Sequence, residues 1–200
     1  MSTSKLSIYN SALIKCGAET ISATGDSNKR ARMVNEQYDK CRREVLSAHP
    51  WNFALKRVQL SQDATAPAFG YDYRYALPAD NLRIWRAWDS SNDSEDHEIL
   101  NWKEENGFIL TDEAAVYALY IYDCQDTTIF EAKFEETLAL RISGDVCDVL
   151  TQRRAKANDL INAYKQWEAE ARSMDGQVGS PEKVIEGDWL VHRTDSEWGY

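Results

Sequence analysis

Apolar residues spaced three and four apart mark four helical stretches, two toward each end of the chain. The first stripe runs from Leu6 to Cys16, and the other three repeat its spacing. An apolar stripe with this period is typical of a helix that is buried along one side. The pattern predicts helices over 4–17, 27–48, 128–150 and 152–173.

Between the two helical pairs the pattern changes to short runs of β-branched and aromatic residues, separated by Pro, Gly, Asn and Asp. Such runs are typical of strands bounded by turns. Asn106-Gly107 favours a hairpin, because both residue types tolerate positive φ. The acidic run 89–98 is expected to be a solvated loop. Six strands of an antiparallel sheet are predicted, over 54–60, 71–76, 82–89, 98–103, 107–111 and 115–122.

The order of these elements predicts an α+β protein. Each helix must bury its stripe against another element, so the helices are expected to form an antiparallel four-helix bundle-like domain. The strands then form an inserted antiparallel β-sheet region, and an extended C-terminal arm follows. The predicted segments are 1–53 for the first half of the helical domain, 54–124 for the β insertion, 125–175 for the second helical half and 176–200 for the arm.

The C-terminal arm lacks periodicity and contains several glycines, yet it carries large apolar side chains. Aromatic residues dominate binding hot spots, so docking of the arm on a neighbouring chain is the favoured interpretation. Packing of the arm on its own domain is the alternative. The candidate anchors are Val184, Ile185, Trp189, Leu190, Trp198 and Tyr200.

Composition and charge favour a globular protein and disfavour binding to nucleic acid. The chain is 43% apolar and shows no apolar run of the length that a signal peptide or a membrane span requires. We therefore expect a protein made and kept in cytoplasm-like surroundings. A formal net charge of -10 gives an average surface that repels phosphate. The four cysteines are far apart and form no CxxC pair, which predicts free buried thiols.

The chain contains no motif of a familiar catalytic, cofactor or metal site. The three histidines match no metal or catalytic pattern, and phosphate-binding loops and nucleophile motifs are absent. We expect neither enzyme activity nor a cofactor or metal. Carboxylates beside the predicted hairpin, at Glu104, Glu105, Asp112 and Glu113, leave one alternative open, a cell-wall hydrolase with Glu/Asp acid–base chemistry.

Two further groups of side chains suggest contacts with partners. Arginines on the second helix and at the start of the fourth are the main basic concentrations of an acidic chain, and they predict salt bridges between subunits. These candidates are Arg30, Arg42, Arg43, Arg153 and Arg154. Tyr71, Tyr73 and Tyr75 share one face of a strand, which favours sheet core or a subunit contact over a glycan-binding platform.

Two sequence runs, together with the order of the elements, carry a family resemblance. The second helix ends on His-Pro-Trp-Asn-Phe-Ala over 49–54, and Tyr-Ala-Leu-Pro-Ala-Asp-Asn-Leu-Arg follows over 75–83. With an opening helix that carries Asn10 and Gly17, these runs resemble the tail tubular protein A family, the head-to-tail adaptors of short-tailed bacteriophages. The resemblance covers nearly the whole chain, and the turn 23–25 departs from it.

The resemblance implies a structural virion protein that forms a ring of twelve copies between the portal protein and the tail nozzle protein. Such a ring surrounds the DNA during ejection, lies at the portal vertex of the virion after assembly in the bacterial host cytoplasm, and inserts in no membrane. The family grips the portal with its C-terminal arm, so the arm's apolar residues become candidates for portal binding. The alternative enzyme would be a virion-associated peptidoglycan hydrolase, and the tyrosine face would make a carbohydrate-binding module.

Overall fold

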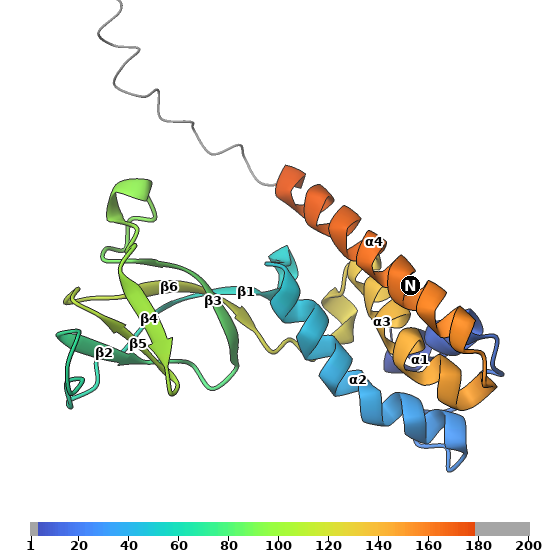
Figure 1. The fold of residues 1–200 in the computed structure, drawn as a ribbon. Coiled ribbons are helices and arrows are strands. Elements are labelled where there is room, and N and C mark those ends of the chain that lie inside the picture. The colour runs from blue at the N-terminus through green and yellow to red at the C-terminus, as the bar shows by residue number, and fades with distance from the viewer. Residues whose placement is uncertain (1–3, 179–200) are drawn as a thin grey trace, which may run out of the picture.

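The chain forms two lobes at opposite ends of an elongated molecule (Figure 1). The computed structural model describes residues 4–178. Within this range, the helical lobe (4–53 and 125–178) holds four α-helices, and the β lobe (54–124) holds six strands. The predicted α+β class is therefore confirmed.

The helices begin and end close to their predicted bounds. Ser4 and Ser7 form a capping box at the start of the first helix, with both backbone-to-hydroxyl distances at 3.2 Å. Gly17 ends this helix at φ 75, a left-handed conformation that glycine adopts without strain. The last helix runs beyond its predicted end at residue 173. The helices are α1 (Lys5–Cys16), α2 (Lys29–Ala48), α3 (Ala132–Thr151) and α4 (Arg154–Val178).

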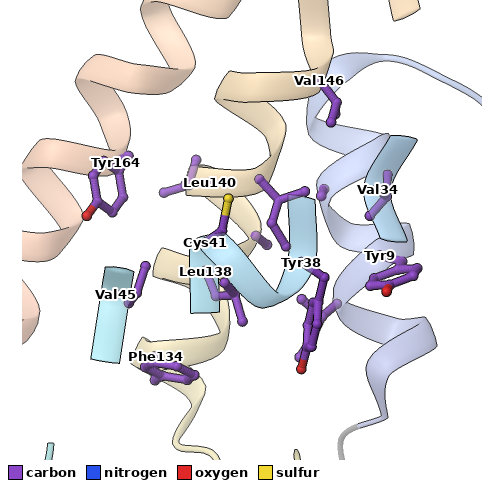
Figure 2. Packing of buried hydrophobic residues seen from close by; sticks show 14 of the residues in the cluster. Tyr9, Val34, Tyr38, Cys41, Val45, Phe134, Leu138, Leu140, Val146 and Tyr164 are labelled. Atoms are coloured by element: carbon purple, nitrogen blue, oxygen red, sulfur yellow. The ribbon is translucent and has the colours of Figure 1, made fainter. Parts of the chain in front are cut away.

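Helix α3 is the centre of the helical lobe, because α1, α2 and α4 all pack against it. Figure 2 shows Tyr38 and Cys41 of α2 among the core side chains of α1 and α3, where Leu138 is fully buried. Helix α4 approaches α3 closely at Gly144, since a Cβ at that position would lie 2.8 Å from Ile161 Cγ1. The apolar stripes of the sequence thus meet on one central helix.

The run 49–54, which carries part of the family resemblance, directly follows α2 and packs the end of this helix against the core. Trp51 is almost completely buried, and its Nε1 donates a hydrogen bond to the Val45 carbonyl at 2.9 Å. Its ring also meets Phe134 of α3 edge-on, with the ring centroids 5.3 Å apart. These residues therefore have a packing role at the end of α2.

The β lobe contains two antiparallel sheets where the sequence predicts one. Each sheet has three strands, in the orders β1-β6-β3 and β2-β5-β4. The prediction of antiparallel pairing is confirmed, but the division between two sheets depends on strand order, which local periodicity does not specify. The strands are β1 (Leu55–Gln59), β2 (Tyr73–Ala76), β3 (Asn81–Trp88), β4 (Trp102–Glu105), β5 (Phe108–Thr111) and β6 (Tyr117–Tyr122).

The turns of the β lobe follow the local sequence in one place and depart from it in another. Asn106 and Gly107 connect β4 to β5 with φ values of 49 and 80, as the hairpin prediction requires. The strand predicted over 98–103 is wrong, because β4 begins only at Trp102. The backbone N–H of Ile99 instead bonds to the Ala87 carbonyl of β3 at 2.9 Å.

Candidate interaction surfaces

The starts of α2 and α4 lie at the end of the helical lobe that is farthest from the β lobe (Figure 1), and both starts carry basic residues. The start of α2 meets the end of α3 there, since Lys29 Nζ donates a hydrogen bond to the Val149 carbonyl at 3.1 Å. Lys156 reaches the same end, because its Nζ lies 3.1 Å from where Gly17 would carry a Cβ. This surface, which we call the basic pole, consists of Lys29, Arg30, Arg32, Arg153, Arg154 and Lys156.

Carboxylates neutralise only part of the basic pole. Arg30 pairs with Glu19 at 2.9 Å. In the part of the chain whose side chains are described, no carboxylate lies within 4 Å of Arg32, Arg153 or Arg154, and all three are exposed. Arg30, Arg153 and Arg154, three of the five arginines predicted as ring contacts, therefore lie together at the basic pole. Arg153 and Arg154 have no carboxylate partner among the described side chains, so both can pair with another molecule.

The β lobe holds most of the negative excess of the chain. Residues 54–124 carry 13 acidic and 6 basic side chains, whereas 1–53 and 125–175 together carry 15 of each. A charge count by predicted segment would have shown this asymmetry from the sequence. Only the structure shows that the acidic segment and the basic pole lie at opposite ends of the molecule.

The run 89–98, which we call the acidic loop, is the part of this lobe with the highest density of carboxylates. Asp93 pairs with Arg57 at 2.8 Å. Glu95 and Asp96 are exposed, and among the described residues no basic side chain lies within 4 Å of either. The predicted solvated loop is confirmed, apart from a short 3-10 turn at Glu95–His97.

Large apolar side chains are exposed on both lobes. In the β lobe, Leu100 directly follows the acidic loop with 89% of its surface exposed, and Phe69 is 88% exposed. In the helical lobe, Val149 is half exposed beside Lys29 of the basic pole. Exposed leucine or valine alone is common, but next to unpaired charges it gives both ends the mixed character of a protein interface.

A buried ion pair joins the two lobes. Arg42 is 1% exposed, and its Nη1 donates hydrogen bonds to Asp123 Oδ1 and to the Cys124 carbonyl, both at 2.5 Å. Arg43 Nε donates to Asp123 Oδ2 at 3.1 Å. The prediction that Arg42 contacts a neighbouring subunit is wrong, because a buried side chain offers it no surface. Arg42 instead ties α2 to the segment that follows β6.

A second polar group stiffens the same junction from the side of the β lobe. Lys56 Nζ donates to Asp80 Oδ2 at 2.7 Å, and this hydrogen bond lowers the pKa of Asp80. Tyr120 donates its hydroxyl to Asp80 Oδ1 at 3.0 Å, and burial together with this carboxylate raises the pKa of Tyr120 to about 12. The Asp123 N–H also bonds to the Asp80 carbonyl at 2.7 Å. We call Arg42, Arg43, Lys56, Asp80, Tyr120 and Asp123 the neck.

No protein-family model matches the chain, and no curated protein matches it. Among the side chains that the structure describes, residues 4–170, no cluster of three or more His, Cys, Asp or Glu is arranged to hold a metal ion. None of the described helices is long and apolar enough to cross a membrane.

The carboxylates of the hydrolase alternative do not converge on one site. Glu104 and Glu105 are adjacent exposed residues of β4, so their side chains point to opposite faces of the sheet. Asp112 Oδ1 accepts a hydrogen bond from the Asp72 N–H at 3.0 Å, while Glu113 contributes its carbonyl to a bond with Tyr75. A glycosidase pair must face one substrate, with one carboxyl in an apolar setting.

The three tyrosines do not form an exposed platform. Tyr75 is almost completely buried, and its hydroxyl donates to the Glu113 carbonyl at 2.7 Å. Tyr73 is partly buried against the apolar core of the β lobe, to which Tyr75 belongs. The interpretation as sheet core is confirmed for Tyr75. A buried Tyr75 cannot stack on a glycan, so the three tyrosines do not make the glycan-binding platform.

All four cysteines, at 16, 41, 124 and 147, are free and buried, as the sequence predicts. Burial raises the pKa of the Cys16 thiol and of the Cys41 thiol to about 12. Because the thiolate is the reactive form of cysteine, both side chains behave as apolar core residues near neutral pH.

The six candidate anchors of the C-terminal arm lie outside the described residues. The other predicted contacts separate into two places, with Arg30, Arg153 and Arg154 at the basic pole and Arg43 at the neck. Asp123, which pairs with two adjacent arginines of α2, is not among the residues predicted from the sequence. No local signal marks Asp123, because its partners are about 80 residues earlier in the chain.

Proposed function

We propose that this chain is a structural virion protein, a head-to-tail adaptor that forms a ring between the portal protein and the tail nozzle protein. The observation that carries this proposal is an elongated chain of two unlike lobes, helical and β, held apart by the neck, in which the Arg42–Asp123 pair is buried. An adaptor between two different rings needs two different docking ends at a constant separation. The sequence resemblance to the tail tubular protein A family points to the same role.

The helical lobe acts as the body of the adaptor, as a bundle-like unit centred on α3. A ring of identical copies is built from heterologous contacts, in which one face of each copy meets a different face of the next. Arg30, Arg153 and Arg154 supply one such face. Arg43, which is 58% exposed, remains a ring-contact candidate close to the neck. The ring has twelve copies, as the resemblance implies.

The acidic excess of the chain suits a passage for DNA. A lumen lined with carboxylates repels phosphate, so the genome passes without adhering. The mechanism is geometric and electrostatic: no bond is made or broken, and no cofactor takes part. DNA is a passenger in the channel, and the adaptor inserts in no membrane.

The part of the predicted arm, 176–200, that follows the end of α4 at Val178 is assigned to the portal. Its candidate anchors are Val184, Ile185, Trp189, Leu190, Trp198 and Tyr200. A chain truncated after Gly179 is expected to fold, because the cores of both lobes lie within residues 4–170, but to lose binding to portal rings. Portal binding that survives truncation would assign the arm to packing on its own chain.

The direct test mixes the purified full chain with purified portal rings and measures the mass of the complex under native conditions. We expect twelve added copies per portal ring. A chain that neither binds portal rings nor occupies the space between portal and nozzle in images of the virion would refute the proposal. Peptidoglycan zymography of the same preparation tests the hydrolase alternative, for which clearing that disappears in Glu104→Gln would be required.

A further inference from the structure

The basic pole and the acidic loop are complementary surfaces that cannot meet within one chain. They lie at opposite ends of the molecule, with the helical core and the neck between them (Figure 1). The neck is held by the buried Arg42–Asp123 pair, so the lobes do not fold onto one another without breaking it. Any contact between these two surfaces therefore joins two molecules.

Each of the two surfaces has charges left over after internal pairing. At the pole, Arg153 and Arg154 are exposed and have no carboxylate within 4 Å among the described side chains. In the acidic loop, Glu95 and Asp96 are exposed, and no described basic side chain lies within that distance. The basic pole and the acidic loop thus offer opposite charges of similar number.

Apolar surface accompanies the charges on both sides. Leu100, which follows the acidic loop, is 89% exposed, and Val149 is half exposed at the pole. Protein interfaces combine an apolar centre with a charged rim, and opposite charges across the rim set orientation and association rate. The basic pole and the acidic loop have both features, since each carries exposed apolar surface and the two carry opposite charges.

We propose that the basic pole of one copy docks on the acidic loop of a second copy of this chain. The contact is head to tail and heterologous, and such contacts generate rings when the rotation between copies closes. The inference rests on the proposed function, to which it adds the residues that join neighbouring subunits. Arg153 and Arg154 face Glu95 and Asp96 of the next copy, and Val149 lies toward Leu100.

A charge swap between two variants of the full chain tests this contact. The pole variant carries Arg153→Glu and Arg154→Glu, and the loop variant carries Glu95→Lys and Asp96→Lys. Sedimentation velocity at low ionic strength measures self-association of each variant. We expect each variant alone to associate about tenfold or more weakly than the parent chain, because like charges then face each other across the interface.

Mixing the two variants is expected to restore association. The acidic loop of the pole variant meets the unchanged pole of the loop variant, and the two altered surfaces also attract each other. Association of the parent chain should weaken as salt rises from about 0.05 to about 0.5 M, since screening shortens the range of these charges. Restored association in the mixture supports the contact, because loss of folding in either variant could not produce it.

A control variant separates this contact from a general effect of charge. Lys40→Glu with Lys165→Glu changes the net charge as the pole variant does, at exposed sites along α2 and α4 away from the pole. We expect this control to associate like the parent chain. Equal weakening in the control and the pole variant would overturn the inference, as would binding of a short DNA duplex at the pole that displaces the second copy.

Failure of this inference can be told apart from failure of the proposed function. If both variants associate as strongly as the parent chain, the pole–loop contact is wrong while the ring itself stands. If the parent chain associates neither alone nor on portal rings, both the contact and the adaptor are wrong.

Discussion

The neck provides the sharpest single test of how the two lobes are held together. Asp123→Ala removes the carboxylate that pairs with Arg42 at 2.5 Å and with Arg43 at 3.1 Å. Arg42 then stays buried without its main counter-ion, and removing one partner of a buried ion pair costs about 3–5 kcal/mol. The Cys124 carbonyl and Asp39, at 3.6 Å, still face the guanidinium. We therefore expect the lower end, a loss of about 3 kcal/mol in the free energy of unfolding.

For a chain of this length, such a loss lowers the melting temperature by about 6–12 °C, at about 2–4 °C per kcal/mol. Far-UV circular dichroism during heating and in a urea series measures both quantities. Arg43→Ala is the matched control, because it removes the other partner of Asp123 from a site that is 58% exposed. Exposed ion pairs contribute less than about 1 kcal/mol. Equal losses of unfolding free energy in the two variants would refute the conclusion that the buried Arg42–Asp123 pair stabilises the neck.

Three further outcomes are expected. Gly144→Ala should cost about 1–3 kcal/mol in a urea titration, because its Cβ would lie 2.8 Å from Ile161 Cγ1; an unchanged midpoint would contradict the close packing of α3 and α4. Asn28→Ala should cost about 1 kcal/mol, since its side chain caps α2, and Asn28→Ser should recover most of that loss. Asp80 has a lowered pKa in the folded chain, so its contribution to stability is present near neutral pH and is lost as the pH falls below about 4. Lys56→Met should reduce that acid-dependent loss, and an unchanged pH profile would show that this pair contributes nothing.

Local sequence signals identified most elements of the fold but not their partners. The turn at Asn106-Gly107 was predictable because positive φ is a property of those two residues alone. The strand expected over 98–103 failed because Ile99 bonds to Ala87 of β3 across the acidic loop, and β4 begins only at Trp102. The second sheet was missed because strand order depends on pairing between distant segments, and the residue pattern of one strand does not specify its neighbour.

Some features of the interaction surfaces are likewise visible in the sequence, and others only in the fold. The net charge of -10 and the two groups of arginines are visible in the sequence. Arg42 and Arg43 are adjacent in the sequence, yet the side chain of Arg42 is 1% exposed and that of Arg43 is 58% exposed. Arg42 turns toward Asp123 in the interior, whereas Arg43 reaches Asp123 from the surface. Arg30 and Arg153 are far apart in sequence, and the pairing of α2 with α3 brings them to one end.

The sequence by itself determined the helices, most of the strands, the acidic balance and the burial of the cysteines, because each depends on local periodicity or composition. The tertiary structure alone decided that α3 is central, that the strands form two sheets, that Arg42 belongs to the neck, and that positive and negative surfaces lie at opposite ends. These features depend on which distant segments meet. The free energy that favours one such arrangement comes from packing and buried charge pairs spread over the whole chain.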